Sequence, residues 1–317
     1  MEQKTRRFMA VNVLYALIPI LLLFVPLLIP KAEFVAYSVE YCAYMVLMEC
    51  GVIVLPTLVY ACLPNGMGIV RSLWLQKPDT SLLLVIPLAF CAYFAVNGAT
   101  VVWMLLLQML GMEQIEQTLA APQNGAQLAA ALAIVALIPA LCEEFFFRGV
   151  LQPALHQQMK PWAAILLGGC LFGLVHGQLA ALPAHVLLGI GLCLVAYWTR
   201  SIWYTVVWHL IQNGMSVLIL YASDAMMQVS GADSAAMMEQ QPVAMLLSAG
   251  SMMMVFGGGT ALFLVLLYLT TRDQRKQIVR CAEDRPHWVV WMPLLAAMVC
   301  IVYRYVISGI AMLGGGA

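Results

Sequence analysis

The chain has 317 residues, of which 63% are hydrophobic and only 9% are charged, and its mean hydropathy is +0.92. A soluble domain is usually about 45–50% apolar and about 25% charged, so this composition excludes an ordinary water-soluble protein and indicates a lipid bilayer as the solvent. The formal net charge is zero, and no basic patch is large enough to suggest a nucleic-acid partner.

Nine long apolar runs follow one another along the chain, each close to or above the roughly 20 residues that a helix needs to cross about 30 Å of hydrocarbon. They cover residues 8–30, 36–63, 80–110, 127–157, 161–182, 183–199, 201–222, 244–271 and 288–313. Only Pro161 and Pro183 separate the runs between residues 127 and 199, so eight spans are the main competing count. We predict an all-α fold, a polytopic integral membrane helix bundle of 8–9 transmembrane helices that forms one domain over residues 1–317.

Charges in the connections predict the orientation of the bundle. Lys4, Arg6 and Arg7 precede the first span and place the N-terminus in the cytoplasm by the positive-inside rule. With nine crossings, the other inside connections hold Arg71, Lys77, Lys160, Arg200, Arg272, Arg275, Lys276, Arg280 and Arg285. The outside connections hold Glu33, Glu113, Glu116, Asp224, Asp233 and Glu239, with Lys31 as their only base. This segregation favours nine spans with the C-terminus outside, and we expect the membrane to be a bacterial plasma membrane.

Ionisable residues inside the predicted spans are few. A charge at the centre of a bilayer costs at least about 2.5–3.5 kcal/mol, so a residue kept there indicates a functional site. Three spans carry such groups: Glu143, Glu144 and Arg148 in the fourth, His176 in the fifth, and His209 with Asn213 in the seventh. Four further residues lie in or near the membrane, namely Glu40, Glu49, His185 and Arg304.

The four further residues are a second group, for which we predict simpler roles. His185 follows Pro183 at the start of a span and is predicted to be structural, near the outer interface. Glu49 lies near the middle of its span and could line the same cavity as the first group. Arg304 and Glu40 both fall in the outer half of the membrane, so we expect them to form a pair.

In the first group, formed by the polar residues of the fourth, fifth and seventh spans, helical spacing predicts which side chains lie on the same face. Glu144 and Arg148 are four residues apart, so they meet on one helix face and can neutralise each other. Glu143 points about 100° away and is out of reach of that arginine. We expect Glu144 and Arg148 to support the cavity, and Glu143 to be available for chemistry.

The two histidine spans complete the set. Phe172 and His176 are one turn apart, as are His209 and Asn213, so each pair shares a helix face. A carboxylate in an apolar cavity is a stronger base than in water, and beside a histidine it can hold and deprotonate a water molecule. A second histidine and a carboxamide can donate hydrogen bonds to a developing oxyanion. These residue types would suffice for attack by water on a peptide carbonyl.

The three motifs also carry a resemblance to a known family. EEFFFR (Glu143–Arg148), FGLVH (Phe172–His176) and HLIQN (His209–Asn213) resemble, in order, the EExxxR, FxxxH and HxxxN series of the CPBP family. That family includes the type II CAAX prenyl endopeptidases and the bacterial Abi-type membrane proteins. The resemblance implies an intramembrane glutamic protease whose catalytic cavity lies inside the bilayer, with a motif-bearing core at about residues 127–222.

The resemblance also implies roles by matching position. Glu143 resembles the carboxylate that activates water, assisted by His176. His209 and Asn213 resemble the pair that stabilises the oxyanion. Glu144, Arg148 and Phe172 resemble supporting residues.

A metal site is the first alternative to this reading, because glutamate and histidine are also zinc ligands. Metalloproteases usually carry HExxH on one helix, and this pattern does not occur in the chain. The nine cysteines form no CxxC pair and mostly lie in apolar runs, which is typical of buried, inert thiols. We therefore predict a metal-independent enzyme without a cofactor.

The function predicted is an intramembrane endopeptidase that hydrolyses a membrane-anchored, lipidated or hydrophobic peptide substrate. Direct attack by water is expected, because no serine or cysteine accompanies the motifs in a nucleophile arrangement. One alternative is a non-proteolytic membrane scaffold or a bacteriocin-immunity protein that only binds a peptide. Another is a proton-coupled transporter. The sequence argues against it, because it shows no two similar halves with broken helices, which are typical of such transporters.

Overall fold

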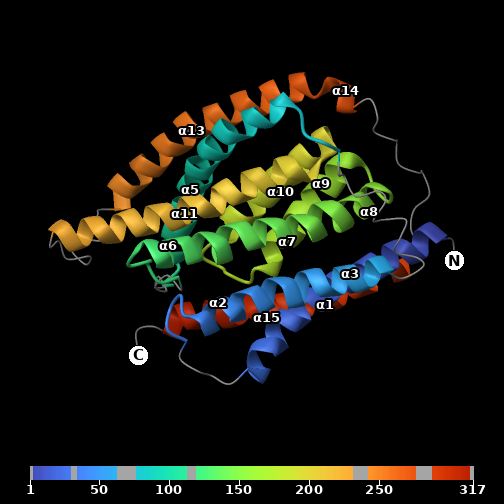
Figure 1. Cartoon of the computed structure of the whole chain (residues 1–317), viewed down its shortest axis with the longest axis horizontal. Coiled ribbons are helices and arrows are strands. Elements are labelled where there is room, and N and C mark those ends of the chain that lie inside the picture. Colours follow the sequence, from blue (N-terminus) through green and yellow to red (C-terminus); the bar gives the residue numbers. More distant parts are fainter. Residues whose placement is uncertain are drawn as a thin grey trace.

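The computed structural model describes residues 3–29, 34–62, 76–112, 119–230, 242–275 and 288–314. Within these ranges every regular element is a helix (Figure 1). Eight helical segments there are long and apolar enough to cross a membrane: Thr5–Pro26, Val39–Cys62, Thr80–Met109, Gly125–His156, Leu182–Thr199, Ile202–Met227, Pro242–Thr270 and Val289–Ile310. The prediction of an all-α, polytopic membrane helix bundle is confirmed.

Several spans consist of more than one helical piece. The elements are α1 (Gln3–Leu28), α2 (Val39–Val46), η1 (Leu47–Val54), α3 (Leu55–Cys62), η2 (Thr80–Leu84), α5 (Val85–Met109), α6 (Gly125–Ala131), η3 (Leu132–Leu137), α7 (Ile138–Phe146), η4 (Phe147–Leu151), α8 (Gln152–His156), α9 (Pro161–Val175), α10 (Leu182–Thr199), α11 (Ile202–Ser230), α13 (Pro242–Thr270), α14 (Arg272–Arg275), η5 (Trp288–Trp291) and α15 (Met292–Gly314). Of the shorter pieces, η1, η3 and η4 are π-helical, whereas η2 and η5 are 3-10 turns.

Each π-helical stretch ends two residues before a proline. The prolines are Pro56 after η1, Pro139 after η3 and Pro153 after η4. Proline has no N–H to donate, and its ring would clash with the carbonyl four residues earlier in a regular α-helix. A wider π turn relieves this clash, so the prolines explain why the spans continue through these positions with locally wider turns.

The predicted span over residues 161–182 is shorter in the structure. Helix α9 has 15 residues, which corresponds to about 22 Å and is less than the hydrocarbon thickness of about 30 Å. It ends because Gly177 adopts a positive φ of 65° and turns the chain back into α10. The described helices therefore include eight long spans, which is the competing count and not the favoured count of nine.

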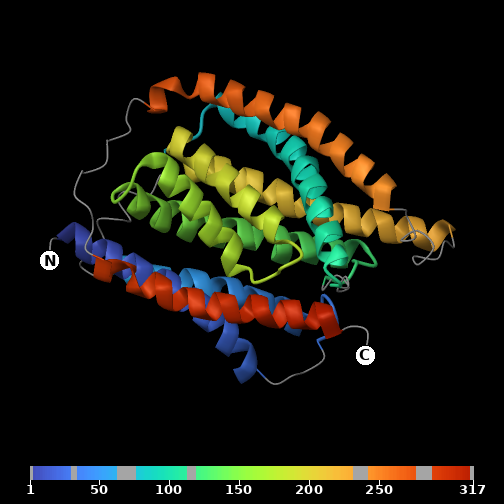
Figure 2. The same cartoon turned by 180° about the vertical axis from the view of Figure 1, so that it is seen from behind.

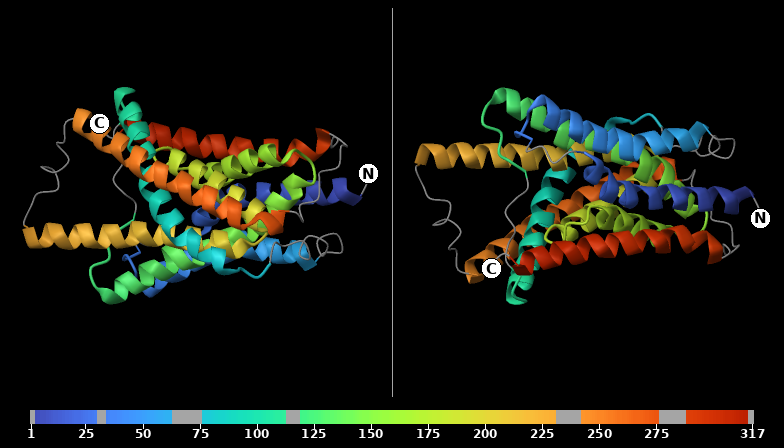
Figure 3. Two further views of the ribbon diagram at one scale, coloured as in Figure 1. Left: turned by 90° about the horizontal axis from the view of Figure 1, so that it is seen from above. Right: turned by 90° about the horizontal axis from the view of Figure 1, so that it is seen from below.

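The helices form three layers. Helices α1 and α15 lie side by side with α2 and α3 on one side of the molecule, while α5 and α13 pack together on the other side (Figures 1 and 2). The span α6–α8 lies between them with α9, α10 and α11, and Figure 3 shows these layers from above and below. The motif-bearing helices thus form the centre of the bundle.

The start of α1 and the end of α15 lie at opposite ends of the bundle (Figure 1). This arrangement agrees with termini on opposite sides of a membrane, while the direction of insertion stays a prediction. Some of the charges used for it lie outside the described residues: Lys31, Glu33, Arg71, Glu113, Glu116, Asp233, Glu239, Lys276, Arg280 and Arg285.

Helices α9 and α10 approach each other closely because glycines line their contact. A Cβ atom at Gly173 would lie 2.4 Å from a methyl carbon of Val186, and one at Gly169 would lie 2.5 Å from the backbone nitrogen of Ile190. Gly189 meets the carbonyl oxygen of Gly169 in the same way, at 2.6 Å. Small residues of this kind allow the backbones of membrane helices to pack directly. The close contact brings the ends of α9 and α10 together beside α7.

Candidate functional site

Glu144 on α7 is the centre of a buried polar cluster. Its Oε1 atom accepts a hydrogen bond from Nη1 of Arg148 at 2.9 Å, and both side chains are completely buried. The same oxygen lies 2.9 Å from Nδ1 of His209 on α11. Arg148 also donates from Nη2 to the carbonyl oxygen of Gly189 on α10, at 3.2 Å. The cluster therefore ties three helices together, and the predicted pairing of Glu144 with Arg148 is present.

Phe172 on α9 packs against this cluster. The guanidinium carbon of Arg148 lies 4.3 Å from the centre of its ring, a distance typical of a cation–π contact. The His209 ring meets Phe172 edge-on, with 5.7 Å between ring centres. Phe172 thus closes the apolar side of the cluster and touches both of the groups bonded to Glu144.

Glu143 points away from that cluster, toward the end of α9. Its Oε2 atom lies 3.8 Å from Nε2 of His176, which is too far for a direct hydrogen bond. This oxygen is buried and accepts no hydrogen bond from any described residue. Nδ1 of His176 lies 2.8 Å from the carbonyl oxygen of Phe172, so this nitrogen carries the proton and Nε2 presents its lone pair toward Glu143. The two polar atoms are thus close enough for one water molecule beside them to bridge both.

Asn213 lies one turn beyond His209 on α11 and next to η3. Its side-chain nitrogen donates a hydrogen bond of 3.0 Å to the carbonyl oxygen of Val135. Pro139, four residues after Val135, has no N–H with which to occupy that carbonyl in the usual helical way. One of the two amide hydrogens of Asn213 is therefore committed to η3, and the other remains available.

Two further residues lie at the site, and the motifs alone would not have located them. The ring of His185 on α10 stacks on that of His176, with 4.0 Å between centres and 15° between planes. Glu49 lies on η1, which packs against α7, and its Oε2 atom is buried without a hydrogen-bond donor among the described residues. The contact between η1 and α7 is direct, because the Sγ atoms of Cys50 and Cys142 are 3.9 Å apart. In the sequence, His185 and Glu49 were marked only by their position in apolar runs. That position shows that keeping them there is costly, but it does not predict which residues they contact.

The predicted pairing of Arg304 with Glu40 is wrong. Arg304 on α15 donates instead to the carbonyl oxygens of Val175 and His176 at the end of α9. The pairing rested on equal depth in the membrane, and depth does not determine which side of a helix faces which neighbour.

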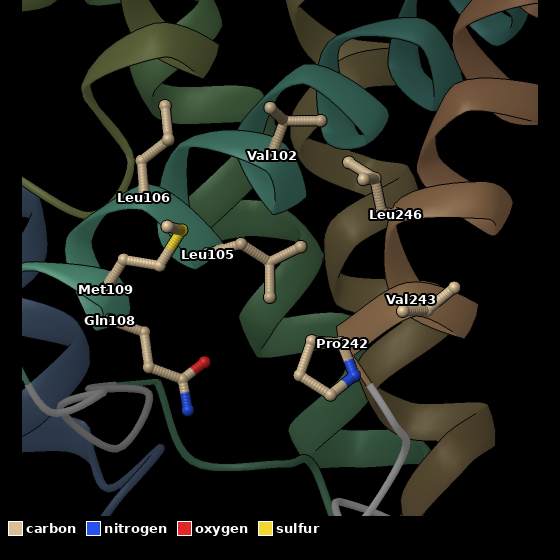
Figure 4. Close-up of a pocket in the computed structure, with 8 residues that line it drawn as sticks. All are labelled: Val102, Leu105, Leu106, Gln108, Met109, Pro242, Val243 and Leu246. Atoms are coloured by element: carbon tan, nitrogen blue, oxygen red, sulfur yellow. The ribbon is translucent and has the colours of Figure 1, made fainter.

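A separate apolar hollow lies between the ends of α5 and α13 (Figure 4). Its volume is about 460 Å³, and its lining is apolar apart from Gln108. The residues around it are Val102, Leu105, Leu106, Gln108, Met109, Pro242, Val243 and Leu246. None of the polar site residues borders it, so the hollow is distinct from the Glu143–His176 gap.

Comparison with known proteins adds independent information. Residues 125–215 match the sequence model of the type II CAAX prenyl endopeptidase Rce1-like family. Over this segment, the chain is similar to the CAAX prenyl endopeptidases. The predicted resemblance is confirmed over this segment, and the eight long apolar helices identify the chain as an integral membrane protein. A search of curated proteins and a search of solved structures found no match.

The matched segment runs from the start of α6 into α11 and contains all three motifs. Helices α1, α2, α3, α5, α13 and α15 lie outside it, and so do Glu49 and Arg304. Among the described residues, no three histidine, cysteine, aspartate or glutamate side chains are grouped as metal ligands.

Proposed function

We propose that the chain hydrolyses a peptide bond of a membrane-anchored, lipidated or hydrophobic peptide substrate, with a water molecule activated by Glu143 and His176 and without a metal ion. The observation that carries this proposal is the gap of 3.8 Å between Oε2 of Glu143 and Nε2 of His176. A water molecule bound there would donate one hydrogen to the glutamate oxygen and the other to the histidine nitrogen. Its lone pairs would then be free to face a substrate carbonyl.

The reaction follows from these contacts. The water oxygen attacks the carbonyl carbon while Glu143 accepts a proton, which gives a tetrahedral intermediate with a negatively charged oxygen. The bond between carbon and nitrogen then breaks, and the proton held by Glu143 passes to the leaving nitrogen. The second product is a carboxylic acid, and no covalent enzyme intermediate is formed.

His209 and Asn213 are proposed to bind the oxyanion. Because Nδ1 of His209 is committed to Glu144, Nε2 is the ring nitrogen left for the oxyanion, and it donates when the ring carries both protons. Asn213 contributes the amide hydrogen that Val135 does not use. In this scheme Glu144, Arg148 and Phe172 hold His209 in place, and the catalytic core is the region of about residues 127–222.

The proposal is tested with purified protein in lipid nanodiscs and a library of peptides with and without a prenyl group. Wild type is compared with Glu143→Gln and with Glu40→Gln, which neutralises an exposed carboxylate on α2 and serves as the matched control. We expect wild type and Glu40→Gln to cleave, Glu143→Gln to lose activity by at least about 10³-fold, and a chelator to have no effect.

Cleavage by Glu143→Gln at the wild-type rate would refute the role of this residue. Activity that is lost with chelator and restored by zinc would refute the metal-independent mechanism. Absence of cleavage by wild type over the whole library would favour the non-proteolytic scaffold or immunity protein.

A further inference from the structure

The histidine proposed to bind water sits just past the end of a helix. Helix α9 ends at Val175, and His176 follows directly. The last carbonyl groups of a helix have no partner within it, and together they form the negative end of the helix dipole. Inside a membrane no bulk water can satisfy them, so another part of the protein must do so.

Arg304 of α15 satisfies these carbonyls. Its two terminal nitrogens donate to the carbonyl oxygens of Val175 and of His176, the second at 2.9 Å. Arg304 forms no salt bridge with any carboxylate of the described residues, and its charge lies against the negative end of the α9 dipole. The adjacent Tyr305 adds a hydrogen bond from its hydroxyl group to the carbonyl oxygen of Gly173, at 3.3 Å.

The turn after His176 is shaped to receive this side chain. Gly177 has a φ of 65°, and a Cβ atom there would lie only 2.7 Å from Cζ and Nε of Arg304. Both the backbone conformation and the contact with the guanidinium group therefore require glycine. On the far side of the turn, the indole nitrogen of Trp103 on α5 donates to the carbonyl oxygen of Leu179, at 2.9 Å.

We propose that Arg304 is a positioning residue, which holds the end of α9 so that Nε2 of His176 stays opposite Glu143. The proposal rests on the function proposed above, and it makes the last span, which lies outside the matched segment, a necessary part of the active site. A rotation of the α9 end would change the 3.8 Å separation and the direction of the Nε2 lone pair, and would thereby move the bridging water away from its position for attack. A misplacement of about 1 Å at a reacting group can cost about 10²-fold in rate.

The test compares wild type with Arg304→Gln, Arg304→Lys and Gly177→Ala in nanodiscs, using a peptide that wild type cleaves. Arg272→Gln is the matched control, because it removes a guanidinium group from an exposed position on α14. We expect Arg304→Gln and Gly177→Ala to lower kcat by about 10- to 100-fold with KM nearly unchanged, and the pH profile of kcat to shift. Arg304→Lys, which can reach one carbonyl but lacks the planar fork, should give an intermediate kcat.

A second readout does not depend on activity. The rate at which diethyl pyrocarbonate modifies His176 is followed by mass spectrometry, with the nearly buried His209 as internal reference. We expect modification of His176 to be faster in Arg304→Gln and unchanged in Arg272→Gln. If wild type cleaves no peptide, the proposed function fails, while this rate still reports whether Arg304 holds His176.

Two results would overturn the role of Arg304. One is a folded Arg304→Gln protein with wild-type kcat, pH profile and modification rate. If Arg304→Gln does not fold, the second result is an Arg304→Lys protein with the same wild-type properties. A single flexible ammonium group cannot reproduce both hydrogen bonds, so wild-type behaviour would show that they are not needed.

Discussion

Glu143 and Glu144 are neighbours in the chain, but they have opposite surroundings. Glu144 is completely buried and shares one oxygen with Arg148 and His209. Glu143 has a buried oxygen without a hydrogen-bond donor among the described residues, and it faces His176 across a gap. A rotation of about 100° between successive helix positions is enough to produce this difference. One glutamate is thus placed to stabilise the fold and the other to take part in a reaction.

This contrast predicts a difference in stability between two adjacent substitutions. Glu144→Gln leaves the buried guanidinium group of Arg148 without a compensating charge, and removing one partner of a buried pair costs about 3–5 kcal/mol. Glu143→Gln removes no hydrogen bond and should change stability by less than about 1 kcal/mol. Thermal unfolding of both variants in the same nanodiscs measures the difference. Equal losses of stability would show that Glu144 and Arg148 do not act as a structural pair.

At the scale of the elements, the site depends on irregular helices and on one close helix contact. The π-helical stretches η3 and η4 flank α7, and the carbonyl of Val135 in η3 receives Asn213. The glycines of α9 and α10 then allow the two backbones to touch, which brings Gly189 within reach of Arg148. At the end of the same helix pair, His176 and His185 stack on each other.

The glycine contact predicts that Gly173→Ala is destabilising. Its Cβ atom would lie 2.4 Å from Val186, so α9 and α10 must separate, and such overpacking costs about 1–3 kcal/mol. Gly258→Ala on α13 is the matched control, because a Cβ atom at this position would meet nothing within 4 Å. Alanine favours a helix over glycine by roughly 0.5–1 kcal/mol, so the control should be neutral or stabilising. A higher unfolding temperature for Gly173→Ala than for wild type would contradict the close contact.

At the scale of the whole molecule, Asp79 connects three parts of the chain at one end of the bundle. It caps η2 by accepting from the backbone nitrogen of Ser81 at 2.8 Å. It also accepts from the hydroxyl group of Tyr204 on α11 at 2.9 Å and from Gln274 on α14 at 2.8 Å. These hydrogen bonds, those to Ser81 foremost, lower the pKa of Asp79 below its usual value of 3.8. The ionised carboxylate is therefore the form that joins the spans.

The lowered pKa predicts how stability depends on pH. The contribution of Asp79 is fully present above pH 3.8 and is lost as the pH falls through its lower value in the folded protein. Asp79→Ala should thus lower stability at neutral pH by about 0.5–2 kcal/mol, the usual loss for an N-cap, and by less in acid. Unfolding curves of wild type and variant at several pH values between about 2 and 7 check this. A difference that grows toward low pH would have the wrong sign for this mechanism.

The sequence by itself determined the membrane class, the positions of the long apolar runs and the pairing of Glu144 with Arg148, but it favoured nine spans where the described helices include eight long ones. These features depend on composition, on the length of apolar runs and on contacts one helical turn apart, all of which are local. It also marked His176, His209 and Asn213 as residues too costly to keep in a bilayer without a role.

Only the tertiary structure decided how these residues are connected. That His209 binds Glu144, that His185 stacks on His176 and that Arg304 holds the end of α9 are contacts between distant segments. Such contacts depend on how each helix is rotated about its axis and on how closely it approaches its neighbours. In spans that are apolar on nearly every side, hydrophobic periodicity carries little information about rotation, because lipid and protein interior accept the same side chains.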